Sequence, residues 1–317
     1  MKPVDVIASC GVEACLLEAG AEKPGNVHPG QCFAGTSYRD LVRGSRALRP
    51  VFLEAARRGF AAGRGSMAVE DIGIGRLVLR AVRAVKRSHD GGNTHLGIVL
   101  LFVPLSAATG LCVSSGGMPV CLRSCFKRVM KCTTVDDAVD VYSAVLAAAP
   151  GGLGRSRLDV HDKGSKARLQ DKGFSLLRLM KYSSKRDRIA SELSAGMPAV
   201  FGFVVPNLEK NLLKTTQPNA IVQTYLQTLA KYPDTLISRK AGKQKARDVS
   251  KKAKSVLKAG GIFTLNARQA IRKLDSYLRS DGNKLNPGTT ADLIAAGLFI
   301  RLLKERINMR PTKRIIL

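Results

Sequence analysis

The residues best equipped for chemistry lie in short polar loops between apolar segments. Residues 88–97 read SHDGGNTHLG and place two histidines, an acid, paired glycines and an Asn-Thr step in one junction. A connection between two helices needs only a glycine and a polar residue or two. All four histidines of the chain fall in loops of this kind. The loops are Lys23–His28, His89–His95, Asp159–Asp162, Asp234–Lys240 and Asn286–Asp292.

Phosphate binding is the chemistry that these loops suit. A helix N-terminus presents free N–H groups and a partial positive charge, and glycine lets backbone amides approach an anion closely. The segments GGNTH and NPGTTAD, each before a predicted helix, have this form, and lysine and arginine add charge-assisted bonds to phosphate oxygens. The candidate phosphate- or nucleotide-binding residues are Lys23, Gly25, Asn26, Gly91, Gly92, Asn93, Thr94, Arg239, Lys240, Asn286, Gly288 and Thr289.

Three carboxylates are candidate magnesium ligands. Magnesium takes one or two carboxylates together with phosphate oxygens, so Asp162, Asp234 or Asp292 could hold an ion that bridges a polyphosphate. Asp292 also follows Thr289 by three residues, which is the spacing of a helix capping box and explains Asp292 without a metal.

His95 and Asp234 are the candidates for acid–base catalysis. The alternative for His95 is a helix-start histidine that is bonded to the backbone. His89 and Asp90 are interpreted as ordinary surface residues.

Helical periodicity and capping signals predict an all-α fold. No internal repeat and no long linker divides the chain, so we expect a single domain over residues 1–317. Residues 59–66 read as a glycine-rich break, 113–131 as a turn or short strand pair, and 158–173 as a polar loop. The predicted helices are 5–19, 38–58, 74–86, 96–113, 134–149, 174–195, 207–231, 240–259, 264–279 and 289–307.

Composition narrows the class of protein. Hydrophobic residues make up 45% of the 317 residues and aromatic residues only 5%, which favours helices and disfavours stacking platforms for single-stranded nucleic acid. The formal net charge of +28 attracts polyanions such as nucleotides or RNA, and the alternative is a solvated basic surface.

The seven cysteines include no C-x-x-C pair and follow no secretory signal, so the sequence predicts free thiols and a reducing cytosol. Cys121, Cys125 and Cys132 match no common zinc spacing and are interpreted as buried or incidental thiols. The uncharged segment Leu96–Val113 is interpreted as a buried core helix, kinked or ended near Pro104, rather than a membrane span.

In their order along the chain, the loops resemble the motifs of the triphosphoribosyl-dephospho-CoA synthase family. That family has a Lys-Pro-Gly motif after its first helix, then GG-V-NTH-K-G, a DT…R segment, and PGG-x-ADLLA near the C-terminus. The resemblance spans residues 13–305, and its NTH and PG-x-x-ADL pieces are the most specific. The matching segments are KPGNV (Lys23–Val27), GGNTHLG (Gly91–Gly97), DTLISRKAG (Asp234–Gly242) and NPGTTADLIAAGLF (Asn286–Phe299).

Some positions depart from the family pattern. The family usually has Leu-Val-Asp where this chain has residues 26–28, and it has a lysine at the place of Leu96 and a valine between GG and NT. Its arginine-rich segment is matched by RDRIASEL at residues 186–193. These departures resemble the divergent archaeal-type branch, whose members need not act on dephospho-CoA.

The resemblance implies an all-helical transferase that moves a triphosphoribosyl group. ATP loses adenine from its ribose C1, and the 2′-hydroxyl of 3′-dephospho-CoA takes its place. Such a step develops oxocarbenium character, so it needs a nearby carboxylate, an acid and a base, while the triphosphate needs cations and Mg²⁺. In this interpretation Asn93 and Thr94 orient phosphate or ribose hydroxyls, His95 is an acid–base or phosphate-contact group, Asp234 and Asp292 bind Mg²⁺, and Lys23 and Arg239 neutralise the triphosphate.

Three functions compete on the sequence. The first is a cytoplasmic, Mg²⁺-dependent transferase, monomeric or homodimeric, that acts on ATP and a CoA-like or other phosphorylated acceptor. The second keeps the metal and the nucleotide but uses water as the acceptor, which makes a nucleotide hydrolase. The third is a non-enzymatic basic protein that binds RNA or another polyanion; the charge of +28 favours it, and the scarcity of aromatic residues and the four loop motifs disfavour it.

Overall fold

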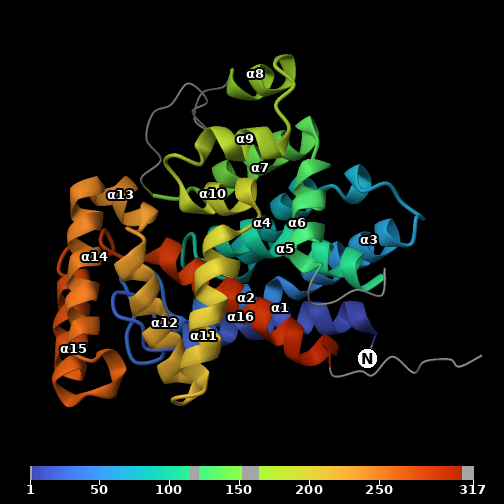
Figure 1. Cartoon of the computed structure of the whole chain (residues 1–317). Helices are drawn as coiled ribbons and strands as arrows, with labels where there is room; N and C mark the ends of the chain where they lie inside the picture. The colour runs from blue at the N-terminus through green and yellow to red at the C-terminus, as the bar shows by residue number, and fades with distance from the viewer. Residues whose placement is uncertain (1, 115–120, 152–163, 309–317) are drawn as a thin grey trace, which may run out of the picture.

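The computed structural model describes residues 2–114, 121–151 and 164–308, and these residues form sixteen α-helices (Figure 1). Within these ranges, β-structure is limited to two isolated antiparallel bridges, which pair His28 with Gln31 and Phe33 with Thr36. The all-α prediction is confirmed. The helices are α1 (Pro3–Gly20), α2 (Tyr38–Ala47), α3 (Arg49–Gly63), α4 (Ile74–Ser88), α5 (Leu96–Ser114), α6 (Leu122–Lys131), α7 (Val135–Ala148), α8 (Ser165–Asp171), α9 (Leu176–Ser183), α10 (Arg188–Ala195), α11 (Val205–Leu212), α12 (Gln217–Lys231), α13 (Thr235–Ala241), α14 (Lys243–Lys258), α15 (Leu265–Arg279) and α16 (Gly288–Asn308).

Several predicted helices are divided in the structure, and each division has a local cause. The segment 38–58 breaks at Leu48, because Pro50 stands in the first turn of α3 and favours a new start there. The segment 174–195 becomes α9 and α10, because the Asp187 side chain accepts a hydrogen bond from the Ala190 N–H and starts α10. Gly242, with a φ of 93°, separates α13 from α14.

Three segments predicted as irregular contain helix. The helix α6 occupies much of 113–131, α8 lies within the predicted loop 158–173, and α3 continues through Gly59 to Gly63. At Gly59 the glycine marks close packing rather than a break. An added Cβ would lie 1.9 Å from the carbonyl oxygen of Ala107 on α5, so only glycine allows the two helices to approach this closely. Gly110 of α5 has the same relation to Ala56 of α3, at 2.1 Å.

The apolar helix α5 is the centre of the core. It packs against α1, α3, α4, α6 and α16, and Pro104 lies inside it without ending it. Phe102 of α5 stacks on Phe299 of α16 with ring centroids 4.7 Å apart, and Phe52 of α3 completes the aromatic cluster. By length and composition α5 could cross a membrane, but 78% of its most apolar window is buried inside the protein, as in a core helix.

Most of the remaining helices lie around this core in two groups (Figure 1). The helices α12 to α15 pack on one another along one flank, and α7, α9 and α10 lie at another side with α8 beyond them. The C-terminal helix α16 crosses the middle of the molecule and packs along α1. As a result the N-terminus of α16 meets the end of α1, the start of α5 and the short helix α13.

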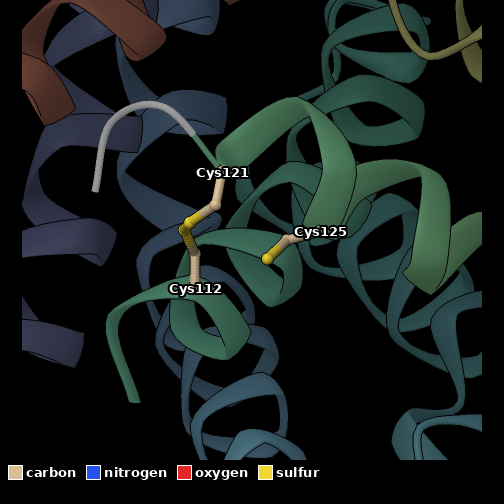
Figure 2. Close-up of side chains that lie close together, drawn as sticks. All are labelled: Cys112, Cys121 and Cys125. Carbon is tan, nitrogen blue, oxygen red and sulfur yellow. A yellow bond between two sulfur atoms is a disulfide. The ribbon is translucent and has the colours of Figure 1, made fainter. Parts of the chain in front are cut away.

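The cysteines differ from the prediction. Cys112, near the end of α5, forms a disulfide with Cys121 at the start of α6, and their Cα atoms are 6.4 Å apart (Figure 2). The expectation of free thiols is therefore wrong for this pair, because the packing of α6 on α5 brings together two residues that share no motif in the sequence. Cys10 and Cys15 are free, as expected, and both are buried.

Candidate functional site

The loop between α4 and α5 is held by a directional chain of hydrogen bonds. The Gly91 N–H donates to His89 Nδ1 at 3.0 Å, and His89 Nε2 lies 3.0 Å from the hydroxyl of Thr94. That hydroxyl lies 2.6 Å from His95 Nδ1, and His95 Nε2 lies 3.1 Å from Ser45 Oγ. Because Ser45 donates its own proton to the carbonyl of Leu41, His95 must donate through Nε2 and accept through Nδ1.

His95 is a neutral, fully paired side chain. It is 3% exposed, and burial lowers its pKa to about 3, with a smaller contribution from the neighbouring His89. Both ring nitrogens are committed inside the protein. The geometry therefore gives His95 the immediate task of holding Thr94 and the loop in place.

His89 is a correction to the sequence interpretation. It is 7% exposed rather than a surface residue, and it supports both Gly91 and Thr94. Asp90 is exposed, as interpreted. The signal that could have revealed His89 is its spacing, because a side chain two residues before a glycine can accept from that backbone N–H and shape the turn.

A cavity of about 310 Å³ adjoins this loop. It lies between α4, the start of α5 and the end of α7, and it combines an apolar wall with several polar groups. A concave, largely apolar space with a few polar groups is the usual form of a small-molecule site. The polar lining includes Lys86, His89, Asp90, Asn93, Thr94 and His95.

Asp234 is a buried helix cap that joins two of the motif loops. One carboxylate oxygen accepts hydrogen bonds from the N–H groups of Leu236 and Ile237 in α13, at 2.8 and 3.1 Å. The other accepts from the N–H and the hydroxyl of Thr290 in α16, at 2.7 and 2.8 Å. Burial raises the pKa of Asp234, although these donors oppose the increase. With four donors on two oxygens, Asp234 ties α13 to α16.

Asp292, one turn into α16, is the carboxylate left without such partners. None of the described residues forms a hydrogen bond with it. It lies against the first turn of α5, where a Cβ on Gly97 would come within 2.0 Å of Asp292 Oδ2. The pKa of Asp292 is raised well above the ordinary value, chiefly by burial and then by the nearby carboxylates of Glu18, Asp234 and Asp187. The Arg239 guanidinium partly offsets this increase. The capping-box explanation does not apply, because Asp292 lies within the helix and has no such hydrogen bond.

Two cations lie beside the cluster formed by the carboxylates of Glu18, Asp187, Asp234 and Asp292, and both are already paired. Lys23 is fully buried; its Nζ lies 3.0 Å from Glu18 Oε1 and also donates to the carbonyls of Glu18 and Ala21. Arg239 forms an ion pair with Asp187 and keeps a buried Nε that has no hydrogen-bond partner. Arg239 therefore has donor capacity left, whereas the three protons of Lys23 have three acceptors.

The other residues of the Lys-Pro-Gly loop shape the chain. The Gly25 N–H donates to Asp275 at 2.7 Å, and its φ of 75° suits glycine. Asn26 donates to the hydroxyl of Tyr225 at 2.8 Å, and Tyr225 donates in turn to the carbonyl of Pro24. These contacts fix the loop against α12 and α15.

The loop before α16 contains one unsatisfied acceptor. The side-chain oxygen of Asn286 is buried and has no hydrogen-bond partner, which is uncommon for a buried polar atom. Gly288 packs on Leu236, and the hydroxyl of Thr289 lies 3.2 Å from that of Thr235. Lys240 contacts Asn283 across the same loop, and burial lowers the pKa of Lys240.

The candidate residues therefore meet in two adjoining places. The loop 91–95, with its cavity, lies at the start of α5, and the loops of Lys23, Asp234 and Asn286 meet near Asp292 at the start of α16. Contact between Gly97 and Asp292 joins the two. Asp162, Asp159 and His161 lie outside the described residues.

Sequence reasoning missed two acids of this cluster, Glu18 and Asp187. Glu18 is buried in α1, on the face that also carries the buried Gly11 and Cys15. A charged residue on an apolar helix face is the signal that could have revealed it. Asp187 lies in the segment RDRIASEL, where an acid directly before a helical run indicates a cap.

Comparisons with known proteins show the family of the chain. The family model described as "CitG: ATP:dephospho-CoA triphosphoribosyl transferase" matches residues 4–311. The 2-(5″-triphosphoribosyl)-3′-dephosphocoenzyme-A synthase of Klebsiella pneumoniae is 24% identical over 295 residues, which cover 90% of this chain and 91% of the relative. A Stutzerimonas stutzeri protein described as the same synthase is 26% identical over 93% of this chain and 90% of its own length.

A solved structure extends the likeness to three dimensions. The crystal structure of an Archaeoglobus fulgidus protein described as a triphosphoribosyl-dephospho-CoA synthase superimposes with a TM-score of 0.61 at 27% identity. The match covers 82% of this chain and 97% of that one. Because the family model spans nearly the whole chain and the motif loops meet in one region, the chain belongs to the CitG family of ATP:dephospho-CoA triphosphoribosyl transferases.

Proposed function

We propose that this protein transfers the triphosphoribosyl group of ATP to 3′-dephospho-CoA where α5 and α16 begin. The bond between ribose C1 and adenine breaks, the base leaves with a proton, and the acceptor's 2′-hydroxyl loses its proton as it bonds to C1. One observation carries the location: the Gly91–Gly97 loop meets the Asp292 cluster through the Gly97 contact. Family membership supports the reaction.

In this proposal the carboxylates act on the charge of the reaction. Glu18, Asp187, Asp234 and Asp292 lie close enough for each of the first three to raise the pKa of Asp292. A negative potential of this kind stabilises positive charge that develops at ribose C1 as adenine leaves. Arg239, which has an unpartnered Nε, balances this potential and would contact the triphosphate.

We propose Asp292 as the side chain that would hold Mg²⁺. The test of fit is the donor set: both oxygens of Asp234 are used by four N–H and O–H donors, whereas Asp292 accepts no hydrogen bond from the described residues. Magnesium requires only one or two carboxylates beside phosphate oxygens and water. Bound there, the ion would neutralise triphosphate charge.

The loop before α5 and the loop before α16 would contact the nucleotide. Asn93 accepts from the Leu96 N–H at 3.3 Å through its oxygen, which leaves its amide group for ribose or phosphate. Asn286 Oδ1 is a buried acceptor without a donor, so it suits a ribose hydroxyl or an adenine amino group and not a phosphate oxygen. Thr94 and His95 keep the cavity wall in shape.

We propose that the protein works in the cytoplasm, where ATP and CoA precursors are made and used. The sequence argument for a reducing compartment assumed that no cysteines are paired, and the Cys112–Cys121 disulfide contradicts that assumption. A homodimer stays a prediction, and light scattering of the purified chain tests it.

Adenine release is the decisive assay. Purified protein with Mg²⁺ and ATP should release adenine when 3′-dephospho-CoA is present, and mass spectrometry should find the triphosphoribosyl adduct. No adenine release by folded protein with any phosphorylated acceptor would overturn the proposal. Release of free triphosphoribose or inorganic phosphate without an acceptor would instead identify a nucleotide hydrolase.

A further inference from the structure

A third cysteine lies beside the disulfide between α5 and α6. The sulfur atoms of Cys112, Cys121 and Cys125 all lie within 4.8 Å of one another (Figure 2). Among the described residues they form the one group of three or more His, Cys, Asp or Glu side chains with ligand atoms so close together. A structural disulfide needs only two of these sulfurs, so Cys125 calls for a separate explanation.

We propose that the reduced protein binds one thiophilic cation of the Zn²⁺ class through Cys112, Cys121 and Cys125. A tetrahedral Zn²⁺ with Zn–S bonds of about 2.3 Å holds its sulfurs about 3.8 Å apart. The three sulfurs already lie within 4.8 Å of one another, and once the disulfide is reduced those of Cys112 and Cys121 would move apart to this spacing. The three sulfurs come from two packed helices, with Cys121 and Cys125 four residues apart on α6. A water molecule would take the fourth position.

The position of Cys121 on its helix favours a thiolate there, and the partial exposure of the group allows entry. Cys121 is the N-cap of α6, where the partial positive charge of the helix end stabilises an anion. Burial raises the pKa of Cys125 despite the opposing Arg128 guanidinium, one turn further along α6, so binding of the cation must displace the proton of this thiol. Cys112 is buried whereas Cys121 and Cys125 are half-buried, so an ion can approach from the α6 side.

The disulfide and the metal site are alternative states of the same sulfurs. A thiol reductant converts the disulfide to two thiols and is itself oxidised to its disulfide, so two electrons and two protons enter the protein. Binding of the cation to three thiols then forms three metal–sulfur bonds and releases three protons. In both states the end of α5 is joined to the start of α6.

Metal titration of the full chain tests this proposal. Protein reduced with a phosphine and freed of it without oxygen is titrated with Co²⁺, which reports thiolate ligands by charge-transfer absorption, and with Zn²⁺ against a chromophoric chelator. Wild type should bind one equivalent. Cys125→Ser should bind at least about a hundredfold more weakly, because even loss of a residue behind a ligand weakens metal sites 10- to 100-fold. Cys125→Ser leaves the disulfide pair intact.

Cys132→Ser is the matched control, because Cys132 is another half-buried cysteine of α6, at its C-cap, and lies outside the group. It should bind as wild type does, and unreduced protein should not bind, since two of its ligands are in the disulfide. Equal affinity in wild type and Cys125→Ser, or no binding by reduced wild type, would overturn the proposal. Far-UV circular dichroism confirms that each variant is folded, and alkylation mapping with and without Zn²⁺ identifies the protected cysteines.

Discussion

Both ring nitrogens of His95 already form hydrogen bonds inside the protein, and these bonds limit what the side chain can do. The NTH motif predicts a histidine that transfers protons or contacts phosphate. The structure instead pairs it with Thr94 and Ser45 and lowers its pKa to about 3. Its role at the reacting atoms stays a prediction, and the geometry supports a positioning role.

The pH dependence of stability tests the state of His95. Because its folded pKa lies below the ordinary 6.5, the unfolded chain binds a proton more readily. The contribution of neutral His95 to the free energy of unfolding is therefore fully present above pH 6.5 and is lost as pH falls toward 3. It amounts to about 2 kcal/mol between pH 7 and pH 5. We expect urea unfolding of wild type to show this loss and His95→Gln to lack it; equal slopes in both proteins would contradict the assigned pKa.

Asp292 and Asp234 should differ in what their replacement changes, activity in the first case and stability in the second. Asp292→Asn should lower kcat/KM for adenine release about 100-fold, because it removes the proposed Mg²⁺ ligand, and added Mg²⁺ should partly restore the rate. Its stability at neutral pH should equal or exceed that of wild type, since a raised carboxyl pKa means that the folded state disfavours the charge.

Asp234→Asn is the matched comparison for Asp292→Asn. It should lower the free energy of unfolding by about 2 kcal/mol, because an amide cannot accept from all four donors that the carboxylate satisfies. Urea unfolding and the adenine assay on both variants provide the test. Wild-type stability in Asp234→Asn would contradict its role as the tie between α13 and α16.

At the scale of elements, close packing of α3 on α5 sets the direction of the core helix and with it the place of the NTH loop. Gly59 and Gly110 allow backbone contact between the two helices. The sequence shows these glycines but not their partners, so Gly59 reads as a break. Only the neighbour on the other helix distinguishes a packing glycine from a breaking one.

We expect Gly59→Ala to destabilise the fold by about 3 kcal/mol, because its Cβ would displace the backbone of Ala107 rather than a flexible side chain. Gly202→Ala is the control: Gly202 is exposed, and a Cβ there has no neighbour within 4 Å. It should be neutral or up to about 1 kcal/mol more stable. Denaturant midpoints of the two variants measure the difference, and similar midpoints would argue against backbone contact between α3 and α5.

At the scale of the whole molecule, part of the net charge of +28 lies on α14, away from the carboxylate cluster around Asp292. Seven lysine and arginine side chains of α14 are exposed, and α14 belongs to the flank formed by α12 to α15 (Figure 1). The exposed cations are Lys243, Lys245, Arg247, Lys251, Lys252, Lys254 and Lys258. This surface attracts polyanions in general and keeps the RNA-binding hypothesis open to experiment.

A triple variant separates this surface from the proposed reaction. Replacing Lys243, Arg247 and Lys254 by glutamate should weaken RNA binding at least about tenfold at about 0.1 M salt and reduce its salt dependence. Adenine release should stay unchanged. Filter binding at several salt concentrations and the adenine assay measure the two properties. Loss of adenine release in a folded variant would contradict the separation.

The sequence by itself determined the class of fold and the set of candidate residues. Local signals sufficed for this, because helix periodicity, caps such as Thr134 with Asp137, and the order of four loop motifs are written within a few residues of one another. They also placed Asp234, Asp292 and His95 among the residues of interest. The helix divisions at Leu48 and Gly242 depend on Pro50 in the first turn of α3 and on the positive φ of Gly242, and the spacing of apolar residues reveals neither.

Only the tertiary structure decided which candidates are already paired. Asp234 receives half of its donors from Thr290, 56 residues away, and Glu18 lies beside Asp292 through the packing of α1 on α16. Cys112 meets Cys121 and Cys125 in the same way, across two helices. The physical reason is that hydrogen bonds, burial and charge act through space, so the state of a side chain depends on neighbours that its own segment does not contain.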